Sequence, residues 1–170
     1  MVPERVKKWA IMVRELEPGS YGVEPNLLMA MIYQESGGDE AALRYEVAWR
    51  YFWNPKANDG LYDKNISVEA NRAYAWNVLG STEFHSQSFS WGLLQVMGSV
   101  ARELGLKGYL AKMCDPAVGL KMGLLHMQKK MRQAKGDTRK TLELYNGSVI
   151  YADEVLKKLA EIKEESGGSA

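Results

Sequence analysis

Glu35 is the residue of this 170-residue chain best suited to acid–base chemistry. It lies four residues after Met31 and seven after Leu28, so in a helix it shares a face with apolar side chains. Gly37 and Gly38 end that helix, which places Glu35 in the last turn, at the negative end of the helix dipole. Burial and the dipole both favour the neutral carboxyl, the form that a general acid for a sugar leaving group requires. The alternative is a carboxylate at a solvated helix end.

Four short segments, each in or next to a predicted helix, occur in order along the chain. They are Glu35-Ser36, Gly92-Leu93-Leu94-Gln95, Leu144-Tyr145-Asn146-Gly147, and Tyr151 with Val155. Read in this order, they resemble the motif series of soluble-type lytic transglycosylases, and the resemblance extends over about residues 27–155. It implies a goose-lysozyme-like helical fold and the cleavage of bacterial peptidoglycan.

The resemblance also implies that a single glutamate does the chemistry. Glu35 would protonate the oxygen of the β-1,4 bond between N-acetylmuramic acid and N-acetylglucosamine, and then act as base while the muramic acid's own hydroxyl attacks. The product would carry a 1,6-anhydro end, and no water would be consumed. Most glycosidases use two carboxylates instead. Segments 92–95 and 144–147 contain neither Asp nor Glu, in agreement with one glutamate. We expect no cofactor.

Five residues of these segments are candidate substrate-binding residues: Ser36, Gln95, Tyr145, Asn146 and Tyr151. Ser36 could hydrogen-bond the substrate near the cleaved bond, and Gln95 offers amide donors and an acceptor to acetamido or hydroxyl groups. Tyr145 could direct its phenol toward the catalytic carboxyl. Asn146 is explained equally well by the helix end that an Asn-Gly pair favours. Tyr151 either lines the same wall or packs in the core.

A long segment, residues 37–91, separates the first two motifs, where the family usually has a short connection. We therefore expect an insertion at about residues 39–90 within a single catalytic domain, residues 1–165. The chain has five Trp and nine Tyr against three Phe, and Trp49, Trp53 and Trp76 lie in this insertion. Rings with a polar atom suit a sugar cleft, so part of the insertion is expected to wall the cleft. The alternative is a packed lid without glycan contact.

The insertion also contains carboxylates that could supply a second catalytic group, namely Glu46, Asp59, Asp63 and Glu83. Glu83 is isolated in a polar segment shortly before Trp91 and could hold a water molecule. With Glu83 as the second carboxylate, the protein would be a hydrolytic muramidase. A further alternative is a glycan-binding module of the same fold without activity.

Hydrophobic periodicity and helix-capping residues predict six or seven helices and one small extended or β region. The helices are expected at about residues 3–17, 25–36, 67–79, 98–104, 116–134, 138–146 and from 149 onward. Alternating residues from Leu43 to Trp53 predict extended chain, with a helix from Asp39 as the alternative. The polar segment 81–90 is expected to lack a helix. The pattern indicates one mainly α domain, followed by a flexible tail at residues 166–170.

Composition excludes several other classes of function. The 22 Lys and Arg balance 21 Asp and Glu, which disfavours a nucleic-acid binder, although residues 121–140 hold seven basic residues against one Asp. That basic stretch is either a solvated helix face or a surface that attracts an anionic wall polymer. One Cys and two His make no zinc set, so we expect no metal. No apolar stretch is long enough to span a membrane, and no apolar signal core follows Met1.

These observations predict a monomer that acts on peptidoglycan glycan strands, with neither nucleic acid nor membrane as partner. Without an export signal in the chain, and with its long insertion, we expect a phage endolysin or a virion-associated lysin. It would be made in the host cytoplasm or carried in a virion, and would act in the periplasm or the wall. The alternative is a bacterial domain from a longer exported chain.

Overall fold

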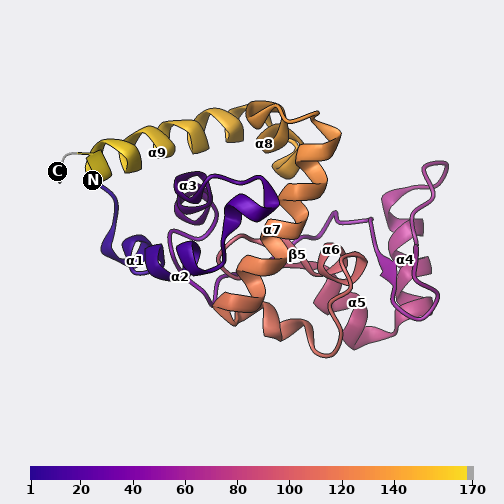
Figure 1. Ribbon diagram of the computed structural model, residues 1–170. Coiled ribbons are helices and arrows are strands. Elements are labelled where there is room, and N and C mark those ends of the chain that lie inside the picture. The colour runs from indigo at the N-terminus through magenta and orange to yellow at the C-terminus, as the bar shows by residue number, and fades with distance from the viewer. Residues whose placement is uncertain (168–170) are drawn as a thin grey trace.

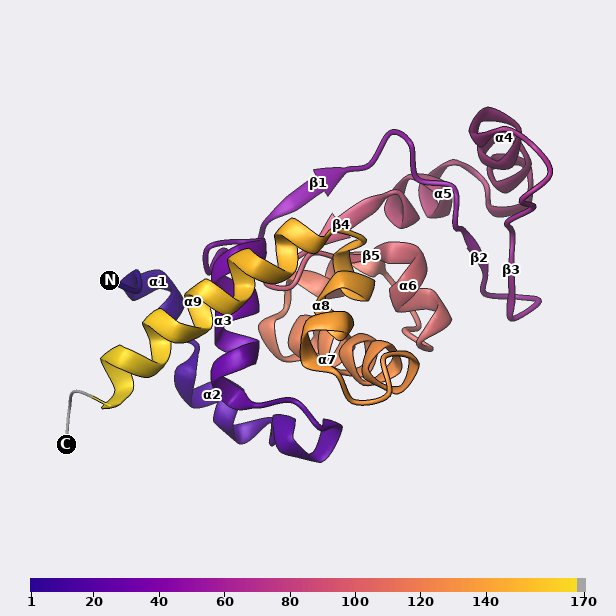
Figure 2. The same ribbon diagram turned by 90° about the horizontal axis from the view of Figure 1, so that it is seen from above.

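Helix α3 (Pro25–Glu35) is the centre of the main core, and every residue from Leu27 to Ile32 is buried. The computed structural model describes residues 1–167 of the chain. A helix that is apolar on all sides has to be covered on all sides. Three helices do so, as Figures 1 and 2 show: α1 (Glu4–Lys7), α2 (Ala10–Glu15) and the long α9 (Val149–Gly167).

Helices α6 to α8 complete the main core together with two short 3-10 helices. Their bounds are η1 (Pro18–Tyr21), α6 (Gly98–Glu103), η2 (Leu110–Cys114), α7 (Pro116–Gln133) and α8 (Thr138–Asn146). The predicted starts of α7 and α8 are confirmed. An Asp115 carboxylate oxygen accepts a hydrogen bond from the Val118 amide at 3.1 Å, and Asp137 caps α8 in the same way. Gly147, at a φ of 87°, ends α8.

The predicted insertion forms a smaller lobe at the opposite end of the molecule from α1 (Figure 1). Its elements are β2 (Trp53–Asn54), β3 (Asp59–Gly60), α4 (Val68–Leu79) and α5 (Ser81–Gln87). Phe52, Leu61, Ala75 and Phe84 form a second hydrophobic core there. The prediction that residues 81–90 lack a helix is wrong. Phe84 stacks on Phe52 at 4.8 Å between ring centroids, and this tertiary contact holds the polar segment in α5.

A three-stranded antiparallel sheet lies between the two lobes (Figure 2). Its order is β1 (Leu43–Tyr45), β4 (Phe89–Trp91) and β5 (Val96–Met97). The alternation from Leu43 to Trp53 therefore marks strand only at its ends, in β1 and β2, and no helix begins at Asp39. Between the strands the chain turns toward α4, where the Arg72 guanidinium donates to the Trp49 carbonyl at 2.7 Å.

Two predicted helix bounds are corrected by the structure. The first helix is divided by a turn at Lys8 and Trp9, and the Trp9 indole donates to the Gly38 carbonyl at 3.0 Å. Helix α9 continues through Ser166 and Gly167, the first two residues of the expected tail, and the Ser166 hydroxyl donates to the Ile162 carbonyl. Residues 168–170 lie outside the described residues. Within the described residues, no helix is long and apolar enough to cross a membrane.

Candidate active site

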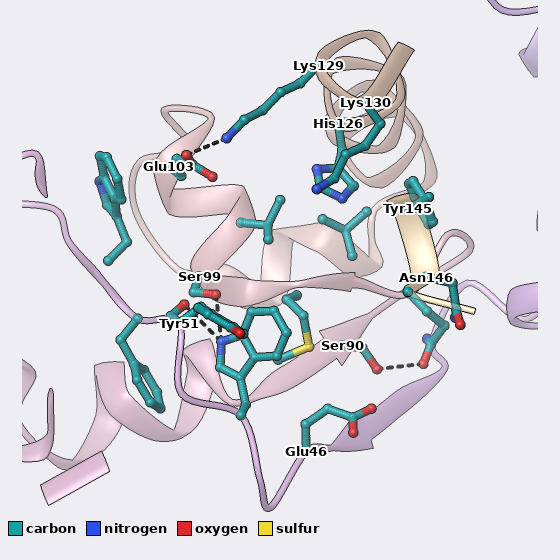
Figure 3. A pocket seen from close by; sticks show the side chains of 18 of the residues that line it. Glu46, Tyr51, Ser90, Ser99, Glu103, His126, Lys129, Lys130, Tyr145 and Asn146 are labelled. Atoms are coloured by element: carbon teal, nitrogen blue, oxygen red, sulfur yellow. Dashed lines mark hydrogen bonds and ion pairs between the residues drawn. The ribbon is translucent and has the colours of Figure 1, made fainter. Parts of the chain in front are cut away.

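A cleft of about 670 Å³ is lined by residues of both lobes. The C-terminal ends of α3 and α8 reach it from the main core, together with β5, α6 and one face of α7. The insertion contributes β1 and the segment that follows, as far as Tyr62. Figure 3 shows the cleft at close range, with His126 and Lys130 of α7 on one side and Glu46 on the other.

Glu35 ends α3 and lines this cleft. Burial raises the pKa of its carboxyl to about 7, and the Tyr151 phenol and the Arg44 guanidinium lower it only in part. A neutral carboxyl therefore persists near neutral pH, as the spacing of Glu35 from Met31 and Leu28 predicts. This is the protonation state in which a carboxyl can act as a general acid.

Tyr151 is buried in the core, which is one of its two predicted alternatives, and it is not among the residues that line the cleft, although its phenol faces the Glu35 carboxyl. Only 5% of the residue is exposed, and its hydroxyl has no hydrogen-bond partner among the described residues. The phenol nevertheless lies close enough to lower the pKa of Glu35, while burial raises the pKa of Tyr151 itself. In this conformation the two groups face each other without a hydrogen bond of ordinary length.

Tyr145 lines the cleft, and burial together with the nearby Glu35 carboxyl raises the pKa of its phenol, but the hydroxyl does not donate to that carboxyl. Its hydroxyl donates to the Leu94 carbonyl at 2.8 Å. The ring packs on His126, with centroids 4.9 Å apart, and stacks beside Tyr151 at 6.3 Å. Tyr145 thus connects α8 to the Gly92–Gln95 segment and shapes the wall next to Tyr151.

Ser36 is not among the residues that line the cleft, so its contact with substrate stays a prediction. The hydroxyl donates to the Leu93 carbonyl at 3.0 Å and accepts from the Gly38 amide at 3.2 Å. It joins the end of α3 to the segment that carries the second motif. Ser36 is therefore a residue that positions Glu35.

Gln95 lines the cleft, but its side-chain amide is engaged within the protein. The amide nitrogen donates to the Ala42 and Gly92 carbonyls at 3.0 and 2.9 Å, and the amide oxygen accepts from the Ser90 hydroxyl at 2.9 Å. Figure 3 shows the last of these bonds. Both donors are used, so the predicted donation to acetamido groups is wrong. These bonds hold a turn in which Gln95 has a φ of 45°, a conformation uncommon for residues other than glycine.

Asn146 is the last residue of α8, is exposed, and lines the cleft (Figure 3). Gly147 takes the left-handed conformation that ends the helix, as the Asn-Gly pair predicts. Both interpretations of Asn146 are thus compatible with its position.

Glu83 is not in the cleft, and the hydrolytic alternative that relied on it is contradicted. Its carboxylate forms a two-bond ion pair with Arg102, at 2.6 and 2.9 Å, and accepts a further bond from Gln87. Burial would raise the pKa of Glu83, but the bonds from Arg102 and Gln87 outweigh it, and the pKa is lowered. The group faces a separate depression beside Gly108 and Tyr109. Glu83 holds α5 to α6.

Two other carboxylates do share the cleft with Glu35, namely Glu46 and Glu103. Each forms an ion pair with a positively charged side chain that lines the same cleft: Glu46 with Arg44, and Glu103 with Lys129. The sequence contained Glu46 as one acidic candidate among four. Its place in the cleft follows from the loop that leads out of β1.

The aromatic wall expected from the insertion is present in part. Trp49, Tyr51, Trp53 and Tyr62 line the cleft, whereas Trp76 packs against Phe84 and His85 in the smaller lobe. Trp49 is fixed by its indole, which donates to the Ser99 hydroxyl of α6 at 2.9 Å. Sequence reasoning missed Tyr51 and Tyr62, which the excess of Tyr over Phe could have suggested.

His126 and Lys130 of α7 also line the cleft, and no motif pointed to them. Burial lowers the pKa of His126 to about 3, so its ring is neutral at ordinary pH. His126 and Lys130 are four residues apart in the basic stretch 121–140, which places them on one face of a helix, and this spacing is the signal that could have indicated them. In the described part of the chain, no group of three or more His, Cys, Asp or Glu residues could hold a metal ion.

Comparison with known proteins agrees with this geometry. No curated protein and no solved structure matches the chain. The family model described as Transglycosylase SLT domain matches residues 15–163, which include Glu35, the Gly92–Gln95 segment and Tyr145. The mainly α fold with few short strands is the one expected of that family. The chain therefore belongs to the transglycosylase SLT domain family, whose members cleave peptidoglycan.

Proposed function

We propose that this protein cleaves the β-1,4 bond between N-acetylmuramic acid and N-acetylglucosamine and leaves 1,6-anhydro-muramic ends. One observation carries the proposal: Glu35, with a pKa raised to about 7, lines the large cleft between the two lobes. A carboxyl with this pKa can give up a proton and take one back at the pH of a living cell.

The proposed reaction uses Glu35 twice. The neutral carboxyl protonates the glycosidic oxygen, and the bond from that oxygen to the muramic acid's anomeric carbon breaks. The resulting carboxylate then takes the proton of the 6-hydroxyl group as that oxygen bonds the same carbon. The proton returns to Glu35, and no water is consumed.

Arg44 and Tyr151 support the intermediate stage, in which Glu35 is ionised. Both groups lower the pKa of Glu35 and so favour its carboxylate form against the effect of burial. The Tyr151 hydroxyl has no other partner among the described residues, so it is free to donate to the carboxylate when the charge develops. In this proposal Tyr151 positions Glu35 and does not bind substrate.

The substrate is a glycan strand of bacterial peptidoglycan, held by the aromatic residues that the insertion brings to the cleft. Trp49, Tyr51 and Tyr62 offer ring faces and edges to sugar rings. The long insertion favours a phage lysin that acts on the host wall.

A second function, hydrolytic muramidase, is favoured by the position of Glu46 in the same cleft. A second carboxylate can activate water for attack, and the product then has a reducing end. Mass spectrometry of the released fragments separates the two functions, since anhydro ends are one water lighter.

The test of the proposed function is Glu35→Gln, measured as turbidity loss of purified cell walls. We expect the rate to fall by about 100-fold or more, because Gln cannot transfer the proton. Glu164→Gln, at an exposed position of α9, is the matched control and should keep full activity. Unchanged lysis by Glu35→Gln would overturn the proposal. Wall binding by the wild type without any release of fragments would identify a glycan-binding module instead.

A further inference from the structure

The charges that line the cleft are almost completely paired. Six charged side chains line it: Glu35, Arg44, Glu46, Glu103, Lys129 and Lys130. Arg44 is paired with Glu46. Lys129 reaches across to Glu103, as Figure 3 shows. His126 is neutral, and so is Glu35 in its acid form. The cleft as described therefore has one charge without a partner, the ammonium group of Lys130.

Lys130 is held at the cleft without an internal partner. It lies one turn after His126 on α7 and is partly buried, and its ammonium group makes no hydrogen bond or ion pair with any described residue. Burial and the neighbouring Lys129 lower its pKa, and Glu103 opposes them only in part. An ammonium group that has lost part of its water without gaining a partner is unfavourable, and an anionic ligand would remove that cost.

The proposed substrate has its negative charge on one sugar of each pair. N-acetylglucosamine is neutral, whereas N-acetylmuramic acid has a lactyl substituent with a carboxylate. Where a peptide stem is attached, the lactyl group is an amide and the carboxylates belong to the stem. A cation in the cleft can therefore distinguish wall glycan from a neutral N-acetylglucosamine polymer.

We propose that Lys130 binds a carboxylate carried by the muramic acid side of the substrate, and so selects peptidoglycan over neutral glycans. The proposal rests on the proposed function for the identity of the substrate. It adds a specificity-determining residue on α7, on the other side of the cleft from Tyr51 of the insertion (Figure 3).

The experiment measures binding by calorimetry in a Glu35→Gln background, so that no strand is cleaved. The probes are neutral N-acetylglucosamine oligomers, stem-free glycan strands with free lactyl carboxylates, and stem-bearing strands. Lys130→Gln should raise the Kd for carboxylate-bearing strands about tenfold, the value of one hydrogen-bonded ion contact. The Kd for neutral oligomers should not change, which also shows that the variant is folded.

Comparison of the three probes identifies the source of the carboxylate. A loss with stem-free strands indicates the lactyl carboxylate, and a loss confined to stem-bearing strands indicates the peptide. Lys130→Arg should keep most of the affinity, and Lys121→Gln, exposed on the same helix and outside the cleft, should keep all of it. A Kd of Lys130→Gln that is unchanged from the parent protein for every probe, or an equal loss with the neutral oligomers, would overturn the proposal. Because the readout is binding, these results stand apart from the lysis assay of Glu35→Gln.

Discussion

The Ser36 hydroxyl donates a hydrogen bond to the Leu93 carbonyl at 3.0 Å and so ties the end of α3 to the second motif. Gly92, next to Leu93, allows the same segment to approach the Met113 backbone of η2 closely. It has a φ of 66°, and an added Cβ would lie 2.5 Å from the Met113 carbonyl oxygen. The first two motifs thus contact each other directly, which explains why a serine follows Glu35.

Ser36→Ala should reduce stability and turnover but leave substrate affinity unchanged. The Leu93 carbonyl would lose its donor and the Gly38 amide its acceptor, which costs about 1–2 kcal/mol. A displaced Glu35 should lower kcat about tenfold. Urea denaturation and steady-state kinetics measure the two effects, with Ser20→Ala, at an exposed serine of η1, as control. A rise in KM at unchanged stability would indicate that Ser36 binds substrate after all.

The activity should fall as the pH rises through about 7. The first step needs the protonated carboxyl of Glu35, whose pKa is about 7, so kcat/KM on soluble glycan strands should decrease about tenfold per pH unit above that value. His126 does not contribute to this limb, because its pKa of about 3 leaves it neutral throughout. Circular dichroism at each pH verifies that the protein stays folded. A flat profile between about pH 6 and 9 would contradict the assignment of Glu35.

Glu35→Gln should stabilise the protein at alkaline pH. The folded-state pKa of Glu35, about 7, lies above the ordinary value of 4.5, so the folded state binds more protons between these values. Stability contributed by the neutral carboxyl is therefore lost as pH rises from about 4.5 to 7. Gln cannot ionise, and at about pH 8 the variant should exceed the wild type by about 1–3 kcal/mol, with little difference at about pH 4.5. Chemical denaturation at the two pH values measures this, and equal stabilities at both would show that burial costs Glu35 nothing.

Features set by local interactions could be predicted from the sequence. Asp115 and Asp137 start their helices through bonds to amides three residues on, and the apolar spacing before Glu35 indicates its burial. Such bonds form between residues that are close in the sequence, so they can be predicted from one sequence.

The partners of the polar motif residues could not be predicted, because they are backbone carbonyls far along the chain. Ser36 and Tyr145 donate to Leu93 and Leu94, which lie 57 and 51 residues away in the sequence. The sequence shows the donor but not the carbonyl that the fold brings to it. Glu83 was misassigned for the same reason, since its partner Arg102 is 19 residues away.

Glu83 should affect stability and not the products. Replacing it with Ala leaves the Arg102 guanidinium, whose side chain is 8% exposed, without its carboxylate partner. The loss should be about 3 kcal/mol, since a nearly buried charge becomes unpaired. Product analysis of the folded variant should show the wild-type ratio of anhydro to reducing ends. A changed ratio of anhydro to reducing ends would indicate that Glu83 takes part in the reaction. Glu46→Gln, at one of the two carboxylates that share the cleft with Glu35, is the informative comparison.

Tyr62→Ala should weaken the binding of long glycan strands and leave short ones unaffected. Tyr62 and Tyr51 line the part of the cleft that the insertion contributes, with their rings 4.6 Å apart and the Arg50 guanidinium over both. Each is about 40% exposed, which leaves ring surface free to contact a sugar. Losing one aromatic contact costs about 0.5–1.5 kcal/mol, so KM for long strands should rise severalfold.

The matched control for Tyr62→Ala is Tyr74→Ala, at a tyrosine of α4 that is exposed but outside the cleft. Kinetics on strands sorted by length provide the readout. Because sugars near the cleaved bond contact Glu35 and its neighbours whatever the strand length, kcat should not change in either variant. An equal rise in KM for short and long strands would place Tyr62 beside the cleaved bond, and no change with either would show that the insertion walls the cleft without binding glycan.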